Sequence, residues 1–204
     1  MGVNLQKGQK ISLAKEGGAG LTKVVMGLGW DAVQPPQQQK KGFFKSLLGG
    51  GGSDGRVDID LDASCGMFDE NKQLVDCVWF QQLRSKDGSI LHTGDNLTGE
   101  GEGDDEQIIV DLPRVPANVK YLVFTVNSFR GQTFNEVENA FCRLVDGSNQ
   151  NEIAKYALSG GGNFTAMIMA KLYRHNNEWK MHAIGESTSG RTVADLVPGM
   201  TNCL

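Results

Sequence analysis

The sequence is built largely from short apolar segments in which polar residues alternate with apolar ones, separated by turns rich in glycine and asparagine. Residues 57–64 and 74–83 alternate in this way, and residues 121–129 form a strongly apolar stretch. A period of two is expected of β-strands, whose side chains point alternately to the two faces of a sheet. About ten such segments predict an all-β fold, an antiparallel two-layer β-sandwich with short helical segments.

Helix-start signals occur at two places near the end of the chain. Thr133 precedes Glu136 by three residues, which is the spacing of a capping box. Residues 192–197 are predicted to form a terminal helix, and the polar residues 175–178 are predicted to turn a hairpin. The order of the strands within the sheets does not follow from these patterns.

Composition limits the class of protein. With 204 residues, 39% hydrophobic residues and a net charge of −4, the chain is interpreted as a single domain over residues 1–204 that does not bind nucleic acid. The four cysteines are far apart and form no C-x-x-C pair, which indicates reduced thiols. No long apolar run or secretory signal is found, so we expect a cytoplasmic protein, with peripheral membrane association as an open alternative.

Residues 94–106 contain six carboxylates and four glycines in thirteen positions. Carboxylate, amide and carbonyl oxygens are hard donors that suit Ca²⁺, whereas zinc or copper sites would require histidine or cysteine. Gly99, Gly101 and Gly103 can adopt a positive φ, so a short loop can curl until its oxygens converge. The simpler alternative is a hydrated acidic loop that binds nothing.

A second group of carboxylates lies in the alternating segment 57–64. Three like charges, Asp58, Asp60 and Asp62, would share one face of a strand, and a bound cation would relieve their repulsion. An EF-hand does not fit, because Ala63 stands where the loop glycine is required and Asp69 where the final glutamate is usual. These carboxylates are therefore assigned to a sheet.

Four motifs of the chain together resemble the TerD family of tellurium-resistance and stress-response proteins. They are Gly27-Leu28-Gly29-Trp30-Asp31, Asp60-Leu61-Asp62-Ala63-Ser64, the acidic stretch 94–106 and Leu172-Tyr173-Arg174-His175-Asn176. The resemblance implies a calcium-binding β-sandwich of the bacterial cytoplasm with two calcium ions near one end. It also implies a role in stress and tellurite resistance and no established enzymatic activity.

Family and chemistry together predict a non-enzymatic calcium-binding protein with about two ions, because one ion would leave many carboxylates unneutralised. The predicted ligands are Asp31, Asp60, Asp62, Asp95, Asn96, Glu100, the carbonyl of Gly101, Asp104, Asp105 and Glu106. The runner-up hypothesis is a metal-dependent phosphoester hydrolase, which would need an open metal position and a base such as His92. Direct chemistry on tellurite by the cysteines is not favoured, because no two of them are vicinal.

Residues 34–55 depart from the family pattern, which usually has a much shorter connection here. This insertion reads as a flexible linker around a basic and apolar patch at residues 40–48. Its large apolar side chains are Phe43, Phe44, Leu47 and Leu48. They are predicted either to cover their own domain or to dock on a partner, meaning another stress or tellurium-resistance protein or the inner membrane surface.

Overall fold

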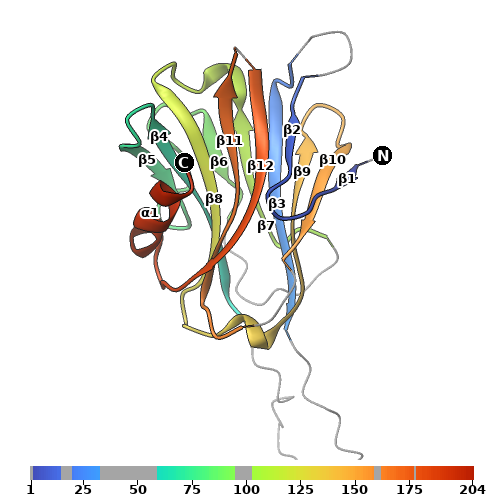
Figure 1. Cartoon of the computed structure of the whole chain (residues 1–204), viewed down its shortest axis with the longest axis vertical. Coiled ribbons are helices and arrows are strands. Elements are labelled where there is room, and N and C mark those ends of the chain that lie inside the picture. The colour runs from blue at the N-terminus through green and yellow to red at the C-terminus, as the bar shows by residue number, and fades with distance from the viewer. Residues whose placement is uncertain (1, 15–19, 33–58, 95–102, 159–161, 177) are drawn as a thin grey trace, which may run out of the picture.

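A computed structural model of the protein describes residues 2–14, 20–32, 59–94, 103–158, 162–176 and 178–204. Within these ranges the strands form two six-stranded sheets that share one apolar core (Figure 1). The predicted all-β sandwich is therefore confirmed. The insertion at residues 34–55, with its four predicted docking residues, lies outside the described residues.

Sheet A has the strand order β1-β10-β9-β3-β7-β6, in which only the β1 and β10 pair is parallel among the described strands. Its strands are β1 (Val3–Asn4), β3 (Lys23–Ala32), β6 (Ile90–His92), β7 (Glu106–Asp111), β9 (Val137–Asp146) and β10 (Glu152–Ala157).

Sheet B has the order β2-β12-β11-β8-β4-β5, and its described pairs are all antiparallel. Its strands are β2 (Lys10–Ser12), β4 (Leu61–Asp69), β5 (Leu74–Val78), β8 (Val119–Ser128), β11 (Ala166–His175) and β12 (Glu178–Thr188). The predicted hairpin between the last two strands is confirmed. The strand predicted over residues 74–83 ends earlier, at Val78, because Trp79 and Gln82 exchange backbone hydrogen bonds of 3.2 and 2.9 Å and turn the chain.

Three short helices accompany the sheets in the described part of the chain: η1 (Leu112–Arg114), η2 (Phe134–Glu136) and α1 (Val193–Asn202). The predicted capping box of Thr133 and Glu136 starts η2. The terminal helix runs five residues beyond its predicted end, through Pro198. Its buried side chains, Val193, Leu196 and Met200, are spaced three and four residues apart and pack on sheet B, which offsets the hydrogen bond lost at the proline.

The end of the sandwich at which β3 finishes, the lower end in Figure 1, collects several strand ends. There Leu28 of β3 lies opposite Glu106, the first residue of β7. The indole Nε1 of Trp30 donates a hydrogen bond of 3.0 Å to the carbonyl of Ile59, just before β4 of the other sheet. The C-terminal side of the acidic stretch 94–106 and the alternating segment 57–64 therefore both reach this end of the sandwich.

Candidate functional site

The acidic stretch connects β6 to β7. Its central residues 95–102 lie outside the described part of the chain, and with them four predicted ligands: Asp95, Asn96, Glu100 and Gly101. The flanking glycines, Gly94 and Gly103, have φ angles of 133° and 107°, a region in which other residues are strained. The N–H of Gly94 donates to Nδ1 of His92 at 3.1 Å. The positive φ expected at Gly103 is thus confirmed.

Asp104 lies over the outer face of sheet A. Its carboxylate accepts hydrogen bonds from Nε of Arg143 at 2.6 Å and from Nε2 of Gln107 at 3.0 Å. It rests on Gly27, where any Cβ would overlap the carboxylate. The first glycine of the Gly27-Leu28-Gly29 motif therefore makes room for an acidic side chain that lies 77 residues further along the chain.

Asp105 lies at the rim, where β3 and β7 meet. Its N–H donates to the carbonyl of Leu28 at 2.8 Å, and its carboxylate accepts from the N–H of Trp30 at 2.9 Å. Burial raises the pKa of Asp105; the Trp30 N–H opposes this shift, and the charges of Asp31 and Asp104 add to it. The charges of two predicted ligands, Asp31 and Asp104, thus act on a third, Asp105.

Glu106 points the other way, into the space between the sheets, and is only 1% exposed. Its Oε2 accepts a hydrogen bond of 2.7 Å from the N–H of Ala63 in sheet B and lies 3.4 Å from Nε2 of His92. The same histidine nitrogen is 3.2 Å from the carbonyl of Ala63. Glu106 and His92 therefore join the two sheets.

Asp60 and Asp62 come from the other sheet and are 6% and 3% exposed. Asp60 faces Arg130, whose Nε lies 3.2 Å from its carboxylate. Asp62 in β4 is opposite Asn127 of β8, whose Nδ2 is 3.5 Å from its carboxylate. Oδ1 of this asparagine is buried without a hydrogen-bond partner among the described residues.

Asp31 stands at the end of β3, exposed to solvent, and its carboxylate accepts from Nδ2 of Asn139 at 2.8 Å.

Sequence reasoning missed several groups that contact the predicted ligands, among them Arg130, Arg143, Asn127 and Asn139. None of them carries a local signal, because each approaches from β8, β9 or the connection between them. The structure thus places Asp31 and Asp104 near enough to Asp105 for their charges to raise its pKa, ties Asp60 and Asp62 to partners beside them, and turns Glu106 inward. Over the described ranges no group of three histidine, cysteine, aspartate or glutamate side chains already has the geometry of a metal site.

The four cysteines are free thiols whose pKa values are raised. All four are unbonded, as predicted. Burial raises the pKa of Cys77 and of Cys142 to about 12, and it raises the pKa of Cys65 and Cys203 as well. Thiolates are therefore scarce near neutral pH, which agrees with the view that these residues do not act on tellurite.

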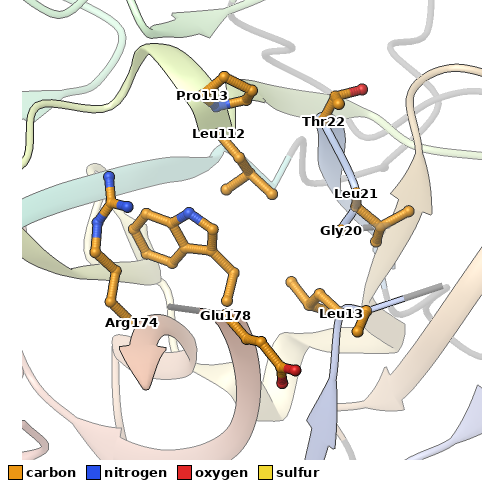
Figure 2. A pocket seen from close by; sticks show the side chains of 10 residues that line it. Leu13, Gly20, Leu21, Thr22, Leu112, Pro113, Arg174 and Glu178 are labelled. Atoms are coloured by element: carbon orange, nitrogen blue, oxygen red, sulfur yellow. The ribbon is translucent and has the colours of Figure 1, made fainter. Parts of the chain in front are cut away.

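A cavity of about 330 Å³ opens at the opposite end of the sandwich (Figure 2). Its apolar walls include Leu13, Leu21 and Leu112, and Glu178 lies at its rim. The guanidinium of Arg174 lies 4.5 Å from the ring centre of Trp179 and donates to the carbonyls of Val119 and Val115 at 3.1 and 2.8 Å. The arginine of the late sequence motif therefore ties β11 to the start of β8.

Fold and site together define a two-sheet β-sandwich protein with carboxylates gathered at one end. The chain matches the family model described as the TerD domain over residues 1–198, and it belongs to the TerD family. It is 49% identical to tellurium resistance protein TerZ of Serratia marcescens, over 95% of this chain and 94% of the relative. It is 45% identical to stress response protein SCP2 of Bacillus subtilis (strain 168), over 97% and 98% of the two chains.

A solved structure of similar fold is that of a homologue of telluride resistance protein (TerD) from Streptomyces coelicolor A3(2). It superimposes with a TM-score of 0.69 at 20% identity and covers 89% of this chain and 98% of that one. At this level of identity the likeness concerns the fold alone. Among the described residues, no helix has the length and apolar character needed to cross a membrane.

Proposed function

We propose that this TerD-family protein is a non-enzymatic, calcium-binding stress-response protein of the tellurium-resistance type, working in the cytoplasm. The observation that carries the proposal is Asp105, whose pKa is raised by burial and by the charges of Asp31 and Asp104, at the end of the sandwich where the acidic stretch enters β7. A bound cation would offset the negative charge around Asp105. Relatives are named for tellurium resistance and stress response, which supports the biological role.

The donors at this end fit a calcium ion. All are oxygens, which calcium prefers, and the described ones come from β3, from the residues before β7 and from β4. Asn127 Oδ1, buried beside Asp62, is an acceptor that a cation or its bound water would satisfy. Asp31 and Asp105 would hold the ion together with ligands from residues 95–102. Asp60 already pairs with Arg130, and Asp104 with Arg143. These two carboxylates would therefore act on the ion through their negative charge more than by binding it directly.

The number of ions, proposed as two, follows from the excess of carboxylates over what one divalent cation neutralises. A hydrolase would need a base beside the metal. His92 is buried at 1% exposure with both ring nitrogens in contact with protein groups, so it does not fit that role. Docking of a partner or of the inner membrane surface by Phe43, Phe44, Leu47 and Leu48 stays a prediction.

Calcium titration followed by thermal unfolding tests the proposal. A hundredfold excess over Kd should stabilise the protein by about 2.7 kcal/mol, which corresponds to roughly 5–11 °C in Tm for a chain of this size. Asp105→Asn should abolish most of this shift. Asp111→Asn, at the other end of β7 and without a side-chain cap hydrogen bond, is the matched control and should respond like the native protein.

Calorimetry should give a stoichiometry of about two ions. No Tm shift at millimolar calcium, or an equal shift in Asp105→Asn, would show that the acidic end does not bind calcium. Turnover of a generic phosphodiester with magnesium or manganese would contradict the non-enzymatic assignment.

A further inference from the structure

Basic side chains from three strands lie in one row on the outer face of sheet B. Lys10 of β2 is opposite His182 of β12, and His182 is opposite Lys171 of β11. Residues directly opposite in antiparallel strands share a face, with Cβ atoms about 5 Å apart. We call Lys10, His182 and Lys171 the basic row.

The next row along the same strands adds to the positive charge. It consists of Ser12, Lys180, Tyr173 and Tyr121, taken from β2, β12, β11 and β8. Neither row contains a carboxylate. The acidic residues of β2, β11 and β12 are Glu178, which accepts from the Ser12 hydroxyl at 3.3 Å, and Glu186, which pairs with Lys7 at 3.0 Å. The positive charge of the two rows is therefore not balanced within them.

Lys171 is the centre of this surface, although it is only 9% exposed. Its ammonium donates to the carbonyl of Cys203 at 2.6 Å and lies 5.7 Å from the ring centres of Tyr121 and Tyr173. Among the described residues that carbonyl is its one hydrogen-bond acceptor, whereas an ammonium has three N–H donors. Burial lowers the pKa of Lys171; Cys203 opposes this shift, and the charges of Lys10 and Lys72 lower the pKa further.

His182 shows the same shortage of negative partners. Its Nδ1 is buried and has no hydrogen-bond partner within the described ranges. Burial lowers the pKa of His182, and the charges of Lys171 and Lys10 lower it further. Lys10 and Lys171 stand on either side of His182, and an anion near them would relieve the repulsion between their like charges.

A pocket of about 290 Å³ opens beside the basic row. Its walls include Lys10, Lys120, Tyr121, Lys171, Tyr173 and His175. Lysine ammonium groups donate only, and tyrosine hydroxyls can donate, so the wall is rich in donors. Leu204 and Arg174 also line it. A backbone oxygen of Leu204 accepts from Nζ of Lys72 at 3.2 Å, and Arg174 already donates to two backbone carbonyls.

We propose that this pocket binds an oxyanion of the phosphate class, held by Lys10, Lys120 and Lys171 with hydrogen bonds from Tyr121 and Tyr173. Charge-assisted hydrogen bonds to phosphate oxygens are strong when several cations converge, and here three lysines approach from β2, β8 and β11. The anion's source is either free phosphate or the phosphate of a lipid headgroup. The site is independent of the proposed calcium site, which uses the rim of β3, β4 and β7.

A phosphate titration followed by ¹H–¹⁵N NMR tests the site on the full chain. Sodium phosphate should give saturable shifts at the amides of Lys10, Lys171 and His182, and sodium chloride at equal ionic strength should not. Lys10→Gln should weaken phosphate binding by about fivefold, because this exposed lysine gives up one charge-assisted contact without disturbing the core.

Lys155→Gln is the matched control, since Lys155 lies in β10 of the other sheet with its ammonium over the ring of Phe141. It should bind phosphate like the native protein. Equal shifts with phosphate and chloride, or unchanged affinity in Lys10→Gln, would overturn the proposal.

Flotation with phosphatidylcholine vesicles, with and without phosphatidic acid, separates the two sources. Binding to phosphatidic acid vesicles that free phosphate competes away identifies a lipid headgroup. Absence of vesicle binding, with the phosphate shifts retained, identifies a soluble anion. Either result supports the oxyanion site.

Discussion

The acidic end and the basic row carry opposite charge and are built in different ways. At the acidic end the carboxylates come from strand ends and a loop, and the described ones meet protein donors: Asp104 meets Arg143, Asp60 meets Arg130 and Asp105 meets the Trp30 N–H. In the basic row the charges stand side by side on regular strands, and acidic partners are missing from the row.

This difference matters for what each region can do without a ligand. A carboxylate with an arginine or an N–H partner is stable in the absence of metal, so the acidic end can form first and take up a cation later. The basic row has no acidic partners of its own among the described residues, so a bound anion would reduce repulsion between positive charges that is present in the free protein. The predictions below test these statements, starting with the largest effect.

Glu106→Ala should destabilise the protein by about 3 kcal/mol, because it leaves the Ala63 N–H buried without its acceptor and removes the carboxylate beside His92. Urea unfolding measures this loss. Glu186→Ala, which removes an exposed pair with Lys7, should cost less than about 1 kcal/mol. If the two variants unfold at the same urea concentration, Glu106 does not link the sheets and belongs with the surface carboxylates.

Gly27→Ala should cost about 1–3 kcal/mol, because its new Cβ would push the Asp104 carboxylate away from Arg143. The variant should also show a smaller rise in Tm with calcium, since the Asp104 carboxylate would no longer be held in its native position. Gly20→Ala, where no atom lies within 4 Å of the added Cβ, should change stability by no more than about 0.5 kcal/mol. A Gly27→Ala protein as stable as Gly20→Ala would mean that Asp104 is not fixed in place.

His182 should make the native protein slightly less stable in mild acid. Its pKa in the folded state is lowered from 6.5 by burial, Lys171 and Lys10, so the unfolded chain takes up the proton first. The stabilising contribution is complete above pH 6.5 and is lost as the pH falls through 6.5 toward the folded value. Urea unfolding as a function of pH should show a shallower decline in His182→Gln, and phosphate should flatten the decline in the native protein. An identical pH profile in the variant would contradict the unbalanced charge of the basic row.

Much of the fold followed from local patterns. Alternation predicted the sandwich, and the capping box at Thr133 and the hairpin at residues 175–178 were correct, because short-range geometry fixes all three. The predicted ends of the strand over residues 74–83 and of the terminal helix were wrong. Trp79 turns the chain through a bridge to Gln82, and α1 continues past Pro198 because its apolar side chains find sheet B. Long-range contacts decided both ends.

The acidic end and the basic row show which features of a charged region can be determined from the sequence alone. The acidic stretch is contiguous, so its composition alone determined that carboxylates and glycines lie close together in the chain. Tertiary structure decided the rest: it turned Glu106 into the core, set Asp104 on Gly27 beside Arg143, and lined up Lys10, Lys171 and His182 from three strands. Strand register brings distant residues into contact, and no local period in the sequence encodes which strands will pair.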